Sequence, residues 1–165
     1  MSQKLCILCV EDEPDVLDVV VRELSVLEDV FPIETAGSAE EAREALAGIE
    51  AEGNALGLVF CDHMMPGENG VDLLVWMQAQ PQWRPSRKVL LTGQAGLEAT
   101  VKAVNEAGLS HYIAKPWDRD ELVQVAREQL SYYVADRKLN PLPYLRHLVM
   151  DLVGDTLRAS STSDT

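Results

Sequence analysis

The sequence is poor in basic and aromatic residues. Lys and Arg number 14 against 27 Asp and Glu, which gives a formal net charge of −13, and aromatic residues make up 5% of the 165 residues. This deficit of positive charge argues against direct binding to nucleic acids or anionic membranes, because both partners are polyanions. The acidity is uneven: between Glu11 and Gly53, fourteen acidic residues stand against only two basic ones, Arg22 and Arg43.

Long hydrophobic runs are also missing. No apolar stretch approaches the length of about 18 residues that suggests a transmembrane helix. The first residues, MSQKLCILCV, lack a long apolar core followed by a small-residue cleavage site, which is the pattern of a secretory signal peptide. The sequence therefore predicts a cytoplasmic protein without a membrane partner.

Cysteine is scarce and odd in number. Cys6, Cys9 and Cys61 all lie inside apolar runs, which is typical of reduced, buried thiols. Cys6 and Cys9 form a CxxC pair, but residues three apart on a β-strand point to opposite faces of the sheet. The pair therefore cannot share a metal ion or a redox bridge.

What the sequence does contain is an alternation of apolar strands and amphipathic helices. Five runs of strand length alternate with five segments in which apolar residues recur at helical spacing. Continuously apolar runs are typical of parallel strands covered on both faces, and Pro32 places the second strand at a sheet edge. The predicted strands span residues 4–10, 30–36, 56–61, 87–92 and 109–114. This pattern predicts an α/β fold of the flavodoxin-like (βα)5 type, with a parallel sheet in the order 2-1-3-4-5.

Specific residues mark the predicted helix boundaries. Pro14 is well placed at the first position of the first helix, and Ser38 with Glu41 three residues later forms a capping box before the second. Gly48 is expected to end this second helix, and Gly108 the fourth. The predicted helices span residues 14–27, 38–48, 71–80, 95–108 and 118–139.

Polar residues stand where four of the predicted strands end. Glu11 and Asp12 follow the first strand, Asp62 the third and Lys115 the fifth, while Thr92 ends the fourth. The carboxyl ends of parallel strands meet at one rim of the sheet, where ligands bind in open α/β folds. Crowded carboxylates repel one another unless a cation neutralises them, and oxygen ligands suit Mg²⁺. A carboxylate can accept a phosphoryl group, so the sequence predicts magnesium-dependent phosphoryl transfer at this rim.

The motifs at this rim make the chain resemble the receiver domain of two-component response regulators. The resemblance covers about residues 4–135 and is carried by VEDEP, DHMMPGENG, LLTG and YIAKPW. It implies that Asp62 is phosphorylated by a sensor histidine kinase or a phosphotransfer protein. It also implies that Asp12, Asp62 and the backbone carbonyl of Met64 hold Mg²⁺, with Glu11 acting through a bound water.

The resemblance assigns roles to three further residues. Thr92 would hydrogen-bond the phosphoryl oxygens, and Lys115 would pair with them. Tyr112 would be an aromatic switch whose ring moves when Thr92 is drawn to the phosphate. In this family the peptide bond before Pro116 is commonly cis.

Some positions depart from the common motifs of this family, and others tune its chemistry. Glu11 stands where Asp is commoner, but a longer arm still serves a water-mediated contact, and Asn69 replaces a frequent Asp outside the site. Met64 and Gln94 occupy two positions that tune hydrolysis of the acyl phosphate in this family. His63 has no second histidine near it in sequence, so we interpret it as a surface- or helix-facing side chain.

Other interpretations stay open. Taken singly, Asp12 could merely cap a helix, Asp62 could open a turn and Tyr112 could be a plain edge-strand aromatic. A phosphatase of haloacid dehalogenase type would also use an aspartate, Mg²⁺ and a lysine, but it needs a DxD motif where this chain has Glu11 and Glu13. A flavin-binding module needs a Gly- or Ser/Thr-rich phosphate loop, and the acids of EDEPD would repel that phosphate.

We assign residues 1–135 to the receiver domain and residues 136–165 to a C-terminal extension. After breaks at Pro141 and Pro143, apolar residues at helical spacing predict an amphipathic helix over about 143–157. Its apolar stripe could fold back on the receiver, pair with a second chain or belong to a longer helical linker. The last residues, ASSTSDT, are expected to be disordered.

The expected function is that of a phosphorylation switch. Phosphorylation of Asp62 would repack the face made by the fourth helix, fifth strand and fifth helix and so change a protein–protein contact. The partner would be a downstream target or an output domain, and a homodimer is another such contact. We expect no enzyme activity beyond self-phosphorylation and autodephosphorylation.

Overall fold

Five parallel strands form one sheet in the computed structural model, which describes residues 3–93 and 97–154. Every neighbouring pair of strands is parallel, and their order is β2-β1-β3-β4-β5. The strands are β1 (Leu5–Val10), β2 (Ile33–Ala36), β3 (Ala55–Asp62), β4 (Arg87–Thr92) and β5 (His111–Ala114). The flavodoxin-like fold expected from the sequence is therefore confirmed.

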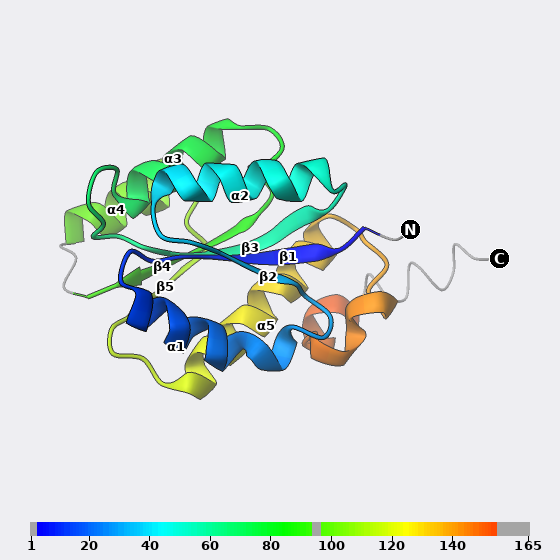
Figure 1. Cartoon of the computed structure of the whole chain (residues 1–165). Coiled ribbons are helices and arrows are strands. Elements are labelled where there is room, and N and C mark those ends of the chain that lie inside the picture. The colour runs from blue at the N-terminus through cyan, green and yellow to red at the C-terminus, as the bar shows by residue number, and fades with distance from the viewer. Residues whose placement is uncertain (1–2, 94–96, 155–165) are drawn as a thin grey trace.

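Helices cover both faces of this sheet (Figure 1). One face carries α1 (Pro14–Leu24), its short 3₁₀ continuation η1 (Ser25–Leu27) and α5 (Arg119–Asp136). The other face carries α2 (Ala39–Ala51), α3 (Gly70–Ala79) and α4 (Leu97–Glu106). Since both faces are covered, every residue of β1 is buried, as its continuously apolar sequence requires.

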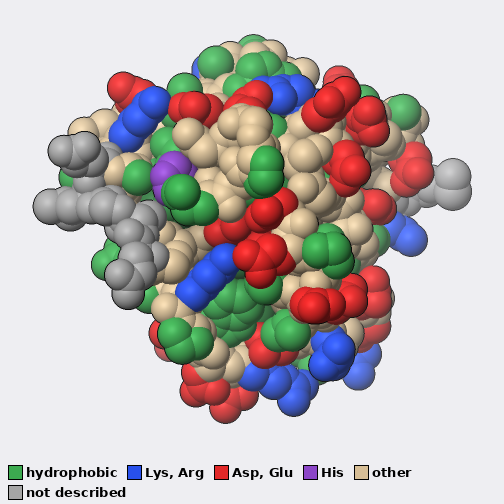
Figure 2. Space-filling view, turned by 60° about the vertical axis from the view of Figure 1, so that its left-hand side comes forward, with side chains coloured by type: hydrophobic (Ala, Val, Ile, Leu, Met, Phe, Trp, Pro, Cys, Tyr) green, Lys and Arg blue, Asp and Glu red, His purple; other side chains and the backbone are tan. Residues whose placement is uncertain are grey.

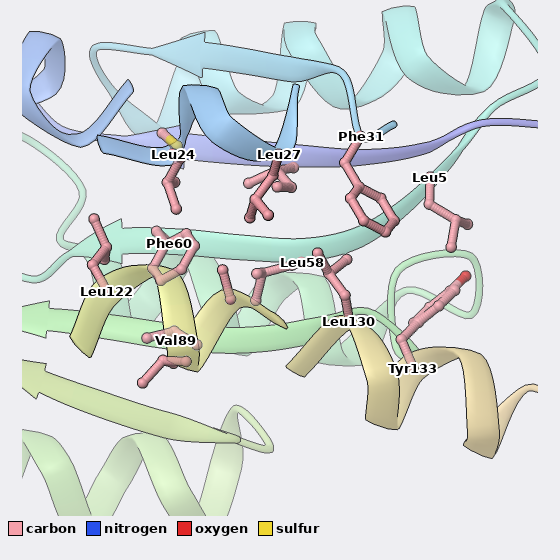
Figure 3. Close-up of a cluster of buried hydrophobic side chains, with 14 of the residues drawn as sticks. Leu5, Leu24, Leu27, Phe31, Leu58, Phe60, Val89, Leu122, Leu130 and Tyr133 are labelled. Carbon is pink, nitrogen blue, oxygen red and sulfur yellow. The ribbon is translucent and has the colours of Figure 1, made fainter. Parts of the chain in front are cut away.

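Two hydrophobic clusters join the layers, one on each face of the sheet. Figure 3 shows the cluster beneath α1 and α5, where side chains of these helices meet over the middle strands. Cys9 belongs to this cluster and Cys6 to the other, because alternate residues of a strand point to opposite faces. The CxxC pair is thus divided between the two faces, as predicted.

The start of α2 agrees with its predicted boundary, but its end does not. The Oγ of Ser38, directly before the helix, accepts a hydrogen bond from the backbone N–H of Glu41 at 3.1 Å. The prediction that Gly48 ends α2 is wrong, because the helix continues to Ala51. A glycine inside a helix costs only about 1 kcal/mol relative to alanine. The turn that follows instead needs the left-handed backbone of Gly53, whose φ is 75°.

The edge strands β2 and β5 are shorter than predicted. β2 begins after Pro32, which has no N–H to donate, although its carbonyl accepts a hydrogen bond from Ile7 at 2.8 Å. β5 begins only at His111, because the N–H of Leu109 still bonds the carbonyl of Ala103 at 3.2 Å and so belongs to the end of α4. Both strands nevertheless take the predicted places in the sheet.

The extension forms two short segments rather than the single predicted helix. Residues Leu142–His147 form a 3₁₀ helix, the chain is irregular at 148–149, and α-helix begins at residue 150. Pro141 and Pro143 lack the N–H groups that a regular α-helix would need after its first turn. The predicted helix end near residue 157 and the predicted disorder of residues 159–165 lie outside the described residues.

The extension folds back on the α1–α5 face near the amino ends of the strands (Figure 1). Leu148 and Val153 are 3% and 0% exposed and belong to the same hydrophobic cluster as α1 and α5. The ring of Tyr144 stacks on that of Phe31 with centroids 5.7 Å apart. Asp29 accepts a hydrogen bond from Arg146 at 2.8 Å. The described part of the extension therefore shares a core with residues 1–135.

Within residues 3–93 and 97–154, none of the helices combines the length and the apolar character that crossing a bilayer requires.

Candidate functional site

Four strand ends bring polar side chains to one rim of the sheet. Glu11 and Asp12 directly follow β1, Asp62 and Thr92 are the last residues of β3 and β4, and Lys115 directly follows β5. Because these strands are parallel, all five residues lie at the same edge, on the left in Figure 1. Figure 2 turns this edge toward the viewer and shows acidic side chains next to a basic one near the centre of the face.

The ammonium group of Lys115 joins two of the carboxylates. Its Nζ lies 3.0 Å from Oδ1 of Asp62 and 3.4 Å from Oε2 of Glu11, and both carboxylates are buried. Burial by itself lowers the pKa of Lys115, but the hydrogen bond and charge of Asp62, together with Glu11, raise this pKa above its ordinary value. The lysine therefore stays protonated and presents a positive charge to any group that binds at Asp62.

Three carboxylates crowd around this lysine. One oxygen each from Glu11, Asp12 and Asp62 lie within 4.8 Å of one another. Burial and the neighbouring charge of Asp62 raise the pKa of Glu11 to about 7. Oδ1 of Asp12 is enclosed and has no hydrogen-bond partner among the described residues. An enclosed carboxylate oxygen without a donor, beside two more carboxylates, fits a hard cation with oxygen ligands, such as Mg²⁺.

The loop after Asp62 folds tightly back on this residue. The backbone N–H of Gly70, the first residue of α3, donates to the carbonyl of His63 at 2.9 Å. A Cβ atom added to Gly70 would lie 1.9 Å from the backbone oxygen of Asp62. Asn69 caps α3, because its side-chain oxygen accepts a hydrogen bond from the N–H of Asp72 at 2.9 Å. The close approach of α3 to the end of β3 therefore requires glycine at position 70.

Gly70→Ala is expected to lower the free energy of unfolding by about 3 kcal/mol, because the clash is with backbone atoms that cannot rotate away. Urea denaturation measures the change. Gly48→Ala is the matched control, since a Cβ there meets nothing within 4 Å. It lies inside α2 and is expected to stabilise the chain by about 0.5–1 kcal/mol. If both substitutions changed the free energy of unfolding to a similar extent, the close approach of α3 to the end of β3 would be contradicted.

The other predicted residues that the structure describes lie in β4, in β5 and in the loop after β3. Thr92 is buried at the end of β4, and Tyr112, on the neighbouring β5, is half-exposed and stacks on the ring of His111. Met64, in the loop directly after β3, is 71% exposed. Gln94 lies outside the described residues.

His63 faces the helices rather than the acidic cluster. It lines a cavity of about 250 Å³ together with Asp72 of α3 and Lys102 of α4. Its Nδ1 is enclosed and has no hydrogen-bond partner within the described part of the chain. This placement agrees with the interpretation of His63 as a helix-facing side chain.

Sequence reasoning missed a contact that holds the segment after Lys115. The indole Nε1 of Trp117 donates a hydrogen bond to Glu23 of α1 at 2.8 Å, across 94 residues of sequence. The peptide bond between Lys115 and Pro116 is cis, as the resemblance implies. Beside it lies a cleft of about 400 Å³, lined by Asp15, Val16, Val19, Glu23, Lys115, Pro116 and Trp117. No local pattern signals such a long-range contact.

Comparison with protein families agrees with this geometry. The model of the response regulator receiver domain matches residues 7–127, which include all the residues of the rim. This match leaves the haloacid dehalogenase alternative without support.

Several transcriptional regulators are similar in sequence. The hydrogenase transcriptional regulatory protein HoxA of Bradyrhizobium diazoefficiens is 32% identical over 133 residues, which are 81% of this chain and 25% of HoxA. The C4-dicarboxylate transport transcriptional regulatory protein DctD of Rhizobium meliloti is 33% identical over 125 residues, which are 74% of this chain and 26% of DctD. The chain thus spans about 25% of the length of these relatives.

Solved receiver domains have the same fold. The signal receiver domain of an HD domain-containing protein from Pseudomonas fluorescens Pf-5 aligns with a TM-score of 0.71 and 28% identity, covering 79% of this chain and 98% of that one. The receiver domain of NtrX from Brucella abortus aligns with a TM-score of 0.63 and 31% identity, covering 75% and 97%. Nearly the whole of each of these receivers therefore corresponds to this chain.

Proposed function

The chain belongs to the response regulator receiver domain family, and from this premise we propose that Asp62 accepts a phosphoryl group from a sensor histidine kinase or a phosphotransfer protein. The observation that carries the proposal is the buried carboxylate of Asp62 at the end of β3, 3.0 Å from the ammonium of Lys115. An oxygen of Asp62 bonds to phosphorus while the phosphorus–nitrogen bond of the donor histidine breaks, and the nitrogen keeps the electron pair. The product is an acyl phosphate.

Asp12, Asp62 and the backbone carbonyl of Met64 would hold Mg²⁺, with Glu11 acting through a bound water. When bound, the ion neutralises charge on the phosphoryl oxygens. The partnerless oxygen of Asp12 and the raised pKa of Glu11 support this assignment, because a cation would satisfy the first and stabilise the ionised form of the second.

Lys115 and Thr92 would bind the phosphoryl oxygens. Lys115 already contacts Asp62, so its ammonium can follow the phosphoryl group with little movement. Thr92, buried at the end of the adjacent strand β4, would donate its hydroxyl to another phosphoryl oxygen. These two side chains bring a positive charge and a neutral donor to the transferred group, which is how proteins assist phosphoryl transfer.

The output of the switch would be a changed protein contact at the α4–β5–α5 face. Tyr112 would turn inward when Thr92 is drawn to the phosphate, since its half-exposed ring is not enclosed by the core. Val101 and Val104 of α4 are also exposed, so this face already presents apolar surface to a partner. The partner would be a downstream target, an output domain or a second copy of this chain.

The cleft beside Lys115 would receive the donor protein. Its wall includes Lys115 itself, and its other residues are mainly apolar side chains of α1 and the segment 116–117. Figure 2 shows hydrophobic side chains directly beside the basic residue at the centre of this face. A donor helix seated there would bring a phosphohistidine next to Asp62.

Incubation with Mg²⁺ and acetyl phosphate tests the proposal. We expect intact-mass spectrometry to show one added phosphoryl group on the natural sequence, and none on Asp62→Asn or after chelation of the metal. Size-exclusion elution of the same samples reports any phosphorylation-dependent association. Phosphorylation of Asp62→Asn to the same extent would overturn the assignment, and sustained turnover of a generic phosphomonoester would favour an enzyme instead.

A further inference from the structure

The segment between Asp62 and α3 is anchored firmly at both ends. We call residues 63–69 the phosphoacceptor loop. At its start, the N–H of His63 bonds the carbonyl of Leu91 at 3.3 Å, and at its end the N–H of Gly70 bonds the carbonyl of His63 at 2.9 Å. Met65 is buried in the cluster beneath α2 and α3. These anchors leave the apex of the loop, residues 66–68, to be held by other means.

One side-chain contact holds this apex. Among the described residues, no backbone hydrogen bond fixes residues 64–68. The Nη2 of Arg43, from α2, donates to Oε2 of Glu68 at 2.6 Å, and both side chains are two-thirds buried. The guanidinium of Arg43 also lies 4.7 Å from the ring centroid of Trp76 in α3. Through these two contacts, Arg43 connects α2 to both α3 and the apex of the loop.

Arg43 is a basic residue in a strongly acidic part of the sequence. It is one of two basic residues among fourteen acids between Glu11 and Gly53, and nothing in the proposed chemistry uses it. A cleft of about 410 Å³ separates the start of α2 from the apex, and Arg43 and Glu68 both line it. Because the cleft leaves the apex without packing on that side, the ion pair is what bridges α2 to the loop.

We propose that Arg43 is a positioning residue that holds the phosphoacceptor loop in the shape required for Mg²⁺ binding. The inference rests on the proposed function, in which the backbone carbonyl of Met64 in this loop is a metal ligand. Loss of the ion pair would free the apex and let this carbonyl leave its place. A partly buried ion pair together with a cation–π contact corresponds to about a threefold to tenfold change in an equilibrium constant.

The test compares two substitutions that change the charge in opposite directions. Arg43→Gln removes a positive charge and Glu68→Gln removes a negative one, so a purely electrostatic effect would tighten Mg²⁺ binding in the first and weaken it in the second. Loss of positioning weakens binding in both. Isothermal titration is expected to show Mg²⁺ dissociation constants raised about threefold to tenfold in each variant, with no further rise in the double variant.

The rate of phosphorylation by acetyl phosphate separates positioning from chemistry. At saturating Mg²⁺ we expect both variants to reach the rate of the natural sequence, because excess metal restores the loop. Arg87→Gln is the matched control. Its guanidinium also pairs with a carboxylate, that of Asp136 at 3.4 Å, and lies 5.2 Å from the ring of Tyr132, but at the opposite end of the sheet. We expect it to leave Mg²⁺ affinity unchanged.

The outcomes test the positioning role of Arg43 and the phosphorylation of Asp62 separately. Unchanged Mg²⁺ affinity in both variants, or shifts of opposite sign, would overturn the positioning role of Arg43. If the natural sequence acquires a phosphoryl group on Asp62 in the same experiment, the proposed function stands even then. If it does not, the proposed function itself fails, whatever the variants do.

Discussion

Lys115→Ala is expected to slow phosphorylation of Asp62 by acetyl phosphate by about 100-fold, the order of effect seen when one preorganised donor to a developing charge is removed. The Nζ of Lys115 lies 3.0 Å from Asp62 and 3.4 Å from Glu11, and both carboxylates are buried, so water cannot fully replace its charge. Initial rates from intact-mass spectrometry, at saturating Mg²⁺, measure the change.

The same substitution is expected to move Mg²⁺ affinity in the other direction. The ammonium competes with a cation for the carboxylates of Glu11 and Asp62, so its removal should tighten metal binding. Slower transfer with tighter metal binding is a combination that general unfolding cannot produce. Lys102→Ala is the control, because Lys102 also pairs with a carboxylate at 3.0 Å, that of Asp72, which is not one of the three carboxylates of the acidic cluster. If Lys115→Ala is phosphorylated at the same rate as the natural sequence, Lys115 does not take part in the transfer.

The geometry of the rim follows closely from the sequence. In a parallel sheet, the residues after successive strands must meet at one edge, so the positions of Glu11, Asp12 and Asp62 fix their proximity once the strands are recognised. Lys115 joins them because β5 takes its predicted place beside β4. The placement of these residues could be predicted because it depends on the topology of the sheet and not on the details of packing.

Packing across long sequence distances could not be predicted in this way. Lys88 lies in a strand taken to be apolar, yet its ammonium is fully buried and donates to the carbonyls of Trp83, Arg84 and Ser86. These acceptors come from the turn before β4, whose shape no periodicity reveals. The Arg43–Glu68 and Trp117–Glu23 contacts escaped prediction for the same reason, since each joins separate elements.

The packing of the C-terminal extension could not be predicted from the sequence either. Its apolar residues predicted that one of its faces is buried, but burial against the receiver, against a second chain or within a longer helical linker fitted the pattern equally. The structure selects the receiver, because Leu148 and Val153 complete the cluster beneath α1 and α5. The backbone N–H of Val149 also donates to Oγ of the buried Ser131 of α5 at 2.8 Å. The folded unit therefore reaches beyond the length that the receiver family model covers, residues 7–127.

Removal of residues 139–165 is consequently expected to lower the free energy of unfolding by at least about 3 kcal/mol, because truncating a buried leucine such as Leu148 costs about 2–5 kcal/mol and the buried Val153 is lost as well. The truncation also uncovers the ring of Phe31, on which Tyr144 stacks. Urea denaturation followed by circular dichroism measures the loss. Because the extension lies at the amino ends of the strands, phosphorylation of the remaining folded fraction should persist.

Two point variants keep this prediction testable if the truncated chain does not fold. Leu148→Ala removes a side chain that is 3% exposed and is expected to cost about 2–4 kcal/mol. Leu142→Ala removes the same side chain from a position in the same extension that is 59% exposed, and is expected to cost less than about 0.5 kcal/mol. Equal stability of these two variants would mean that the extension does not pack on the receiver in solution. A large difference, by contrast, would make residues 139–153 part of the receiver core, so that excising the family-matched segment alone would yield an incomplete protein.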